Sequence, residues 1–286
     1  MPKYNLLESV LFLPTHLNEK KLKNELRGKT ILITGASSGI GEEFAYLLAD
    51  CNAHLILVAR REEKLLTMKS EIEKGAARVS VFRADLRNKE EMDGLLAFVH
   101  QLPDGLDVLV SNAGISINRS IHHSVDRYHD FTRTMAINYF APVQLVLSFI
   151  PLLEKNNGHI INISTINALL LPVPNWAAYQ SSKSAFDTWF RSASPELNTK
   201  GITTTAIYLP LVKTPMIQPT AAYQNMPAMR PSHVAKIIGQ SLYTKRKKYQ
   251  PWWLVFGQLA SLLFRGPLER AMSRIIRKRR SKLGNR

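Results

Sequence analysis

One cysteine, Cys51, occurs among the 286 residues, and acidic residues are scarce beside basic ones. A single cysteine excludes a disulfide within the chain and is typical of a reducing compartment, so we predict a cytoplasmic protein. The 22 Asp and Glu against 38 Lys and Arg leave a net charge of +16. The imbalance is local, because residues 244–286 hold 13 basic residues and one acid, Glu269, and account for +12 of the total.

Long hydrophobic runs are also missing from both ends of the chain. The uncharged stretch 249–264 includes Pro251 and Gly257 and is shorter than the roughly 20 apolar residues that a membrane-spanning helix needs. The apolar patch at residues 6–13 contains Glu8 and is followed, not preceded, by lysines, which is unlike a secretory signal. We expect this patch to form a short amphipathic helix that packs on the domain; contact with a membrane surface is the alternative.

The length and a hydrophobic content of 45% favour one α/β domain with extensions over two domains. We assign an N-terminal extension to residues 1–28, the domain to 29–243, and a basic, aromatic tail to 244–286.

The domain begins with a strand, a glycine-rich loop and a helix. Residues 30–34 are typical of a buried parallel strand, and residues 42–49 are typical of a helix with acids in its first turn. The glycines between them permit a tight turn, and the helix N-terminus offers free N–H groups to an anion. The sequence therefore predicts a site for the phosphates of a nucleotide. The predicted contacts are Gly35, Ser37, Ser38, Gly39, Ile40 and Gly41.

The loop has the spacing G-x-x-x-G-x-G after Thr34, and it resembles the nucleotide-binding loop of the short-chain dehydrogenase/reductases. The resemblance covers about residues 28–240. It implies a doubly wound parallel sheet with helices on both faces, a Rossmann fold, that binds a nicotinamide cofactor at the carboxyl ends of its strands. It also implies a homo-oligomer. Neither a metal site nor a nucleic-acid partner is expected.

Arg60 and Arg61 follow the second predicted strand, residues 54–59, where this architecture places the adenosine ribose. An acid there accepts hydrogen bonds from a free 2′-hydroxyl, whereas arginine pairs with a 2′-phosphate. No acid occupies positions 59–61, so the sequence favours NADPH or NADP+ over NADH.

Two further family motifs follow the third and fourth predicted strands, residues 78–84 and 108–110. Asp85 and Leu86 match the family's acidic position beside the adenine ring. The run 111–114 resembles the N-N-A-G signature, with Ser111 in place of the first asparagine. The resemblance assigns cofactor contacts there to Asn112, Ala113 and Gly114.

A third motif follows the predicted strand 203–208. Pro210 and Thr214 match the family's P-G-x-x-x-T, which holds the nicotinamide and its phosphates, and Leu211 replaces the glycine.

Tyr179 and Lys183 are four residues apart on a predicted helix and therefore lie on one face. A phenol has a pKa of about 10, and a nearby cation lowers that pKa. Such a tyrosine can donate a proton to a carbonyl oxygen as hydride reaches the carbon. The resemblance assigns the acid/base role to Tyr179, and the lowering of its pKa and contact with the cofactor ribose to Lys183. It also implies that Asn138, in a helix predicted at 126–153, marks a bulge whose carbonyl holds a water of the proton relay.

The hydroxyl that orients the substrate carbonyl has two candidates. In the family a serine lies 13 residues before the tyrosine, and here that position is Ile166. One inserted residue between 168 and 176 aligns Thr165 with the serine. Ser164 is the alternative if the predicted strand 159–164 ends in a bulge.

Runs at 119–131, 138–140 and 209–216 resemble the bacterial fatty acyl-CoA reductases within the family. This implies NADPH-dependent reduction of a lipophilic carbonyl such as a fatty acyl-CoA or fatty aldehyde; another class of alcohol or ketone is the alternative. The methionine-rich segment 216–229 is interpreted as a flexible lid over such a ligand. A catalytically silent nucleotide-binding scaffold is the alternative from another class, and the presence of Tyr179, Lys183 and Asn138 argues against it.

The tail joins the aromatic residues Trp252, Trp253 and Phe256 to basic clusters at 245–248 and 277–280. Tryptophan suits the headgroup level of a bilayer, and basic residues suit anionic lipid. We expect the tail to hold the protein peripherally on the inner face of an anionic membrane. The alternative is that the apolar part packs on the core or on a partner subunit while the basic part is disordered.

Overall fold

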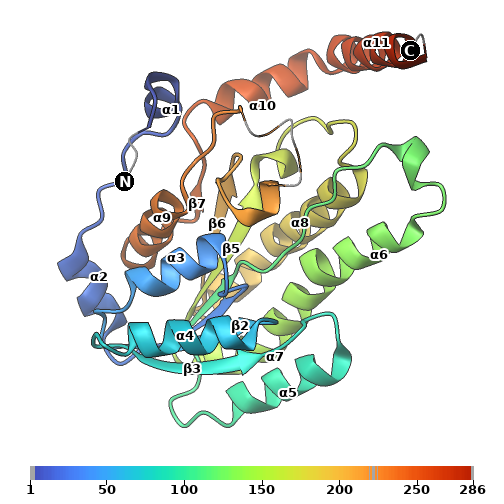
Figure 1. Ribbon diagram of the computed structural model, residues 1–286. Helices are drawn as coiled ribbons and strands as arrows, with labels where there is room; N and C mark the ends of the chain where they lie inside the picture. Colours follow the sequence, from blue (N-terminus) through green and yellow to red (C-terminus); the bar gives the residue numbers. More distant parts are fainter. Residues whose placement is uncertain (1–3, 219, 221–222, 224, 285–286) are drawn as a thin grey trace.

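The computed structural model describes residues 4–284 except 219, 221, 222 and 224, with side chains described as far as residue 277. Its centre is a sheet of seven parallel strands in the order β3-β2-β1-β4-β5-β6-β7 (Figure 1). The strands are β1 (Thr30–Thr34), β2 (His54–Ala59), β3 (Arg78–Arg83), β4 (Val108–Ser111), β5 (His159–Thr165), β6 (Thr203–Leu209) and β7 (Lys248–Tyr249). The predicted doubly wound α/β fold is confirmed.

Helices cover both faces of this sheet because its strands are apolar on both sides. Ile31 and Ile33 of β1 face one core cluster, and Leu32 between them faces the other. The first cluster lies under α2 (Glu19–Leu26), α3 (Gly39–Leu47), α4 (Glu62–Ile72) and α9 (Pro231–Thr244). The second lies under α5 (Lys89–His100), α7 (Ala141–Lys155) and α8 (Ala177–Thr199), with α6 (Tyr128–Met135) against α8.

The strand order reverses between β1 and β4, which are neighbours although two strands separate them in the chain. Connections leave these strands in opposite directions, so a crevice forms at their carboxyl ends. Hydrogen bonds join the two strand ends there. Thr34 Oγ1 accepts from the backbone N of Asn112 at 2.9 Å and of Ala113 at 3.0 Å, and Asn112 Nδ2 donates to the Thr34 carbonyl at 2.9 Å.

The helix predicted at 126–153 is interrupted where a bulge was expected. A π-helical turn at Ala136–Phe140 joins α6 to α7 and carries Asn138. By length and composition the whole stretch Tyr128–Lys155 could cross a membrane, but it includes buried core residues such as Leu145, Phe149 and Leu153. We therefore assign it to the core of the domain.

Both extensions pack on the domain. The N-terminal one forms α1 (Leu6–Leu11) and α2, and Phe12, Leu22 and Leu26 are buried in the first core cluster. The segment after residue 243 forms β7, α10 (Leu254–Leu263) and α11 (Arg265–Gly284). Strand β7 pairs with β6 and Leu254 is fully buried, so the start of the predicted tail packs on the domain.

Short helical turns complete the connections. They lie at Ile121–Ser124, Ile166–Ala168 and Pro215–Ile217. The last two follow β5 and β6, at the edge of the sheet where the crevice opens.

Candidate active site

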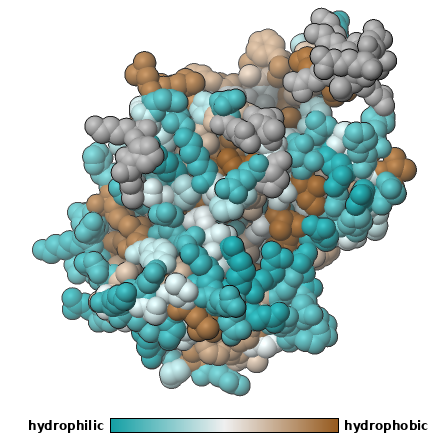
Figure 2. Space-filling view, viewed as in Figure 1, coloured by the Kyte–Doolittle hydropathy of each residue, from teal (hydrophilic) through white to brown (hydrophobic). Residues whose placement is uncertain are grey.

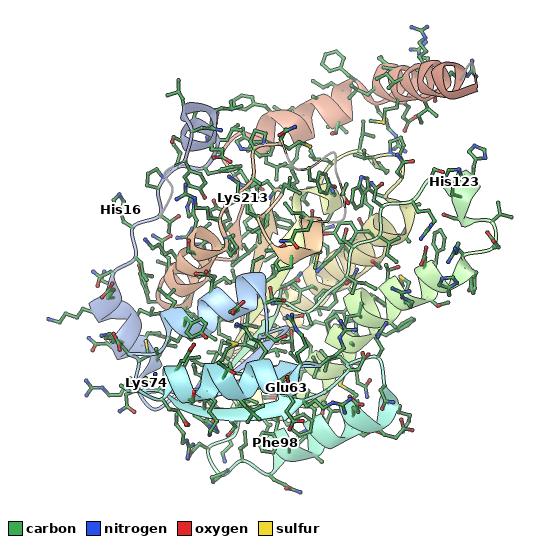
Figure 3. All side chains as sticks on the ribbon, in the orientation of Figure 1. His16, Glu63, Lys74, Phe98, His123 and Lys213 are labelled. Carbon is green, nitrogen blue, oxygen red and sulfur yellow. The ribbon has the colours of Figure 1, made fainter. Side chains whose placement is uncertain are left out.

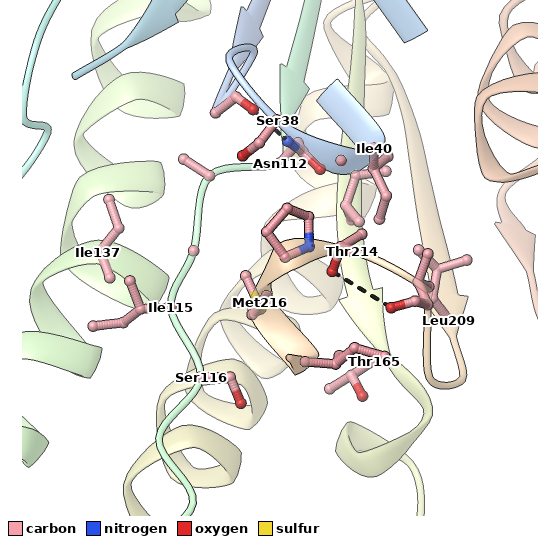
Figure 4. Close-up of a pocket in the computed structure, with 18 of the residues that line it drawn as sticks. Ser38, Ile40, Asn112, Ile115, Ser116, Ile137, Thr165, Leu209, Thr214 and Met216 are labelled. Carbon is pink, nitrogen blue, oxygen red and sulfur yellow. Dashed lines mark hydrogen bonds between the residues drawn. The ribbon is translucent and has the colours of Figure 1, made fainter. Parts of the chain in front are cut away.

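A cavity of about 430 Å³ lies at the carboxyl ends of β1, β2, β4, β5 and β6. Figure 4 shows Ser38 and Asn112 at one end of it and Ser116 and Thr165 at the other. Every residue predicted to bind the cofactor lines this cavity except Gly41, and so do the catalytic candidates except Asn138. The structure therefore brings together motifs that span residues 35 to 214.

The glycine-rich loop shapes the nucleotide end of the cavity. Gly35 and Gly39 have backbone φ angles of +66° and +60°. Residues that carry a Cβ adopt such angles only with strain. A Cβ on Gly41 would lie 2.5 Å from the carbonyl oxygen of Gly35, so Gly41 acts by letting the helix approach the loop rather than by lining the cavity. Ser38 is the N-cap of α3 and makes no side-chain cap hydrogen bond. The N-terminus of α3 can therefore receive an anion from the cavity.

Arg60 and Arg61 line the same end but differ in their contacts. Arg61 reaches back to the glycine loop: its Nη2 donates to the Ser37 carbonyl at 2.8 Å and to Ser37 Oγ at 3.1 Å. Arg60 makes no side-chain hydrogen bond among the described residues, and its positive charge contributes to lowering the pKa of Asp85. Arg60 is thus the more available cation for a ligand phosphate.

Asp85 is held by an arginine that the sequence analysis did not single out. Arg87 lines the cavity and binds Asp85 through two nitrogens, at 2.9 and 2.6 Å. These hydrogen bonds hold the pKa of Asp85 below its ordinary value. The position of Arg87, two residues after Asp85 and in addition to Arg60 and Arg61, is a sequence signal that could have predicted a pocket rich in cations.

Thr214 and Pro215 close over the glycine loop. A Cβ on Gly39 would lie 2.8 Å from Thr214 Cγ2, so the segment after β6 passes directly beside the start of α3. Pro210, Leu211 and Thr214 line the cavity. The chain follows this path with Leu211 at the position where the family has glycine.

Tyr179, Thr165 and Lys183 line the opposite end. Burial raises the pKa of Tyr179, and a hydrogen bond with the Thr165 hydroxyl opposes that rise. Burial lowers the pKa of Lys183 to about 8, and its Nζ donates to the Ile163 carbonyl at 3.1 Å. The expected lowering of the Tyr179 pKa by Lys183 is not seen here: burial dominates, and the group that opposes it is Thr165.

Asn138 fixes a loop of the cavity wall from the π-helical turn. Its Oδ1 accepts from the Ile115 N at 3.0 Å, and its Nδ2 donates to the Ile115 carbonyl at 2.9 Å and to Ser182 Oγ at 2.9 Å. These three hydrogen bonds fix the Asn138 side chain between the loop at Ile115 and helix α8.

Ser164 and Thr165 are adjacent, but their hydroxyl groups have different hydrogen-bond partners. Ser164 Oγ donates to the buried carboxylate of Asp187 on α8 at 3.4 Å, whereas Thr165 interacts with Tyr179. Arg191 Nε also binds Asp187, at 2.8 Å. Asp187 and Ser182 were not predicted, because their roles depend on which face of α8 meets β5 and the π-helical turn.

Aromatic side chains surround Tyr179. Trp176 stacks on Tyr223 with ring centroids 5.4 Å apart and meets Tyr179 edge-on at 6.0 Å. Tyr223, Met216 and Met226 line the cavity, as expected for an apolar segment over the ligand. Residues 219, 221, 222 and 224 of the expected lid lie outside the described residues.

Comparison with known proteins decides the family. A family model described as short chain dehydrogenase matches residues 29–225. This chain belongs to the short-chain dehydrogenases. It is an oxidoreductase with the Rossmann fold of that family, as the sequence predicted.

Known relatives of this short-chain dehydrogenase include a fatty acyl-CoA reductase of Acinetobacter baylyi, 40% identical over 247 residues, which are 86% of this chain and 82% of the relative. A short-chain dehydrogenase from Sphingobium yanoikuyae in complex with NADPH has a TM-score of 0.72 and 21% identity, over 86% of this chain and 95% of that one. A metagenomic short-chain oxidoreductase in complex with NADP has a TM-score of 0.66 and 27% identity, over 77% and 92%.

Proposed function

We propose that this short-chain dehydrogenase uses NADPH to reduce the carbonyl of a lipophilic substrate, a fatty acyl-CoA or a fatty aldehyde. The observation that carries the proposal is one cavity with a helix N-terminus and three arginines at one end and Tyr179, Thr165 and Lys183 at the other. The 40% identity to a fatty acyl-CoA reductase and the fold shared with a 27% identical oxidoreductase in complex with NADP support it.

The residues that would hold NADPH fit an anionic dinucleotide. The uncapped start of α3, with Gly35, Ser37, Ser38, Gly39 and Ile40, suits the diphosphate, and Arg60 suits a 2′-phosphate. Further predicted contacts lie along the same cavity at Arg61, Asp85, Leu86, Asn112, Ala113, Gly114, Pro210 and Thr214. When bound, the cofactor supplies the hydride.

The protein's own groups then handle the proton. Thr165 donates a hydrogen bond to the substrate oxygen, and Tyr179 gives its proton to that oxygen. Because burial raises its pKa, Tyr179 stays protonated near neutral pH, which suits the direction of reduction. Lys183 supplies a cation near the developing phenolate, and Asn138 fixes the wall at Ile115.

The test is NADPH oxidation by the purified protein with ketones, fatty aldehydes and acyl-CoAs of varied chain length. Tyr179→Phe removes the transferable proton and should lower kcat by at least about 10²-fold while NADPH binding, measured by fluorescence, is retained. Turnover of short polar ketones in preference to long-chain substrates would contradict the substrate class. Full activity of the Tyr179→Phe variant would contradict the mechanism.

We propose further that the C-terminal segment holds the enzyme on an anionic membrane surface. Trp252, Phe256, Leu262 and Leu263 are exposed, and basic side chains follow on α11. The cytoplasmic location and the homo-oligomer implied by the family stay predictions.

A further inference from the structure

Helix α1 exposes most of its apolar side chains and buries its one charged side chain, while Leu11 packs against the first core cluster. Leu6 and Leu7 are 85% and 56% exposed, whereas Glu8 is the one buried residue of the helix. Glu8 Oε1 lies 2.6 Å from Lys213 Nζ and accepts from the Ala228 N at 3.3 Å. Lys213 is labelled in Figure 3. A surface helix in water buries its apolar side, so this orientation suits an apolar phase outside the protein.

Hydrogen bonds join helix α1 to the two tryptophans at the start of α10. Trp252 Nε1 donates to the Val10 carbonyl at 3.0 Å, and Trp253 Nε1 donates to the Leu11 carbonyl at 3.2 Å. These hydrogen bonds hold the exposed apolar side chains of the two helices close together, and Figure 2 shows brown patches at its upper edge, where Figure 1 places α1 and α10. We call this set of side chains the two-helix apolar face. It consists of Leu6, Leu7, Val10, Leu13, Trp252, Val255, Phe256, Leu259, Leu262, Leu263 and Phe264.

The charges beside this face select its partner. Helix α11 follows directly and exposes Arg265, Arg270, Arg274 and Arg277. Its single acid, Glu269, is paired with Arg265 at 3.0 Å. An apolar face with tryptophan at its border and a basic flank is complementary to an anionic bilayer, whose headgroups lie beside its apolar interior. A partner protein would not require one sign of charge along a whole helix.

Contacts of α1 also connect the face to a cavity beside the active site. Lys213 and Ala228, which hold Glu8 of α1, line a second cavity of about 380 Å³. That cavity shares Tyr223 and Met226 with the active-site cavity. On its other side, α10 packs on the segment after Thr165, where Ser261 Oγ accepts from the Leu171 N at 3.3 Å.

We propose that α1 and α10 insert together into the surface of an anionic bilayer, and that the lipophilic substrate enters the active site from that bilayer. The inference rests on the proposed function and adds the N-terminal helix to the membrane contact. The α1 surface is as necessary as the C-terminal segment, because the two are one face.

The test compares the full-length protein with Leu6→Gln/Leu7→Gln. Glutamine forms helices about as well as leucine, so α1 is preserved while its apolar surface is lost. Leu66→Gln is the matched control, since Leu66 is 50% exposed and belongs to α4, a helix that lies away from α1 and α10 (Figure 1). Binding to vesicles of phosphatidylcholine and phosphatidylglycerol is measured by co-sedimentation. Turnover is measured with a short soluble aldehyde and with a long-chain aldehyde dissolved in the vesicles.

The double variant should bind vesicles at least about tenfold more weakly than the wild type and lose turnover of the vesicle-borne aldehyde in parallel. The control variant should match the wild type, and all three proteins should turn over the soluble aldehyde equally. Equal vesicle binding by the double variant overturns the inference and leaves the C-terminal membrane contact standing. If the wild type ignores vesicles but is a dimer by light scattering that the double variant loses, a second copy covers the face, and both membrane proposals fail.

Discussion

The two hydroxyl groups at the end of β5 are adjacent in sequence, but each has its own partner. Because Thr165 interacts with Tyr179 while Ser164 binds Asp187, we expect Thr165→Val to lower kcat by about 10²-fold with little change in NADPH binding. Ser164→Ala should retain most activity and lower the free energy of unfolding by about 1 kcal/mol. Steady-state kinetics and urea unfolding of both variants check this. The reverse pattern would identify Ser164 as the orienting hydroxyl.

Arg60 and Arg61 should differ when each is replaced by alanine. Arg60→Ala removes only a cation that faces the ligand, so NADPH binding should weaken by about 10- to 100-fold while NADH binding is unchanged. Arg61→Ala also releases Ser37 of the glycine loop and should weaken both cofactors. Titration of each variant with each cofactor decides. An unchanged preference for NADPH in the Arg60 variant would remove this residue from the 2′-phosphate site.

The predicted site residues that line or border the cavity share a local cause. The glycine loop, Asn138, Tyr179 and Lys183 are set by spacing within one turn or one helix, so the pattern alone places them in the cavity or beside it. Arg87, Ser182 and Asp187 act through partners that only the packed structure brings near. Burial raises the pKa of Tyr179, and this effect could not be predicted from sequence, because burial depends on the whole cavity while the Tyr-Lys spacing is local.

Among the secondary-structure elements, α1 depends on a single buried charge. Burial opposes the ionisation of Glu8, but hydrogen bonds from Lys213, the Ala228 N and the Asn5 N outweigh it and hold the pKa of Glu8 below 4.5. The ionised form is therefore stabilised in the folded protein. This contribution is fully present above pH 4.5 and is lost as the pH falls through the lower pKa of the folded state.

We accordingly expect Glu8→Ala to lower the free energy of unfolding by about 2 kcal/mol at pH 7. The difference from the wild type should shrink as the pH falls below 4.5. Glu269→Ala is the control, since its pair with Arg265 is exposed and should contribute little at any pH. Chemical unfolding at several pH values measures both variants, and a difference that does not change with pH would contradict the role given to the Glu8 carboxylate.

The strands β1 to β6 could be predicted because each is a run of apolar or β-branched residues between turn signals. Strand β7 could not, because Lys248 and Tyr249 carry no such pattern and pair with β6 only through its free edge. The position of α10 on the domain could not be predicted from the sequence either. Its sequence carries no charge, and Leu254, the residue that anchors it in the core, looks no different from the leucines that stay exposed.

For the molecule as a whole, charge and apolar surface make separable contributions to the proposed membrane binding. A chain ending at residue 264 keeps β7 and α10 and loses the basic helix α11. Electrostatic attraction is screened over about 10 Å at 0.1 M salt and about 3 Å at 1 M, whereas burial of apolar groups is not. Vesicle binding by the full chain should weaken with salt but persist, and binding by the shortened chain should be weaker and insensitive to salt. Salt-independent binding by the full chain would contradict the electrostatic part.

The hydrogen bonds from Trp252 and Trp253 to α1 join residues about 240 positions apart. At a translation rate of about 5 to 20 residues per second, α1 leaves the ribosome roughly 10 to 50 s before these partners are made. During that interval α1 lacks the tryptophans that bind its backbone and, at first, Lys213, which binds Glu8, and the nascent chain is exposed to chaperones and to aggregation. Completion of the fold is therefore expected only after Trp252 and Trp253 have been synthesised, so the protein's yield in a cell should depend on the chaperones that bind α1 during that interval.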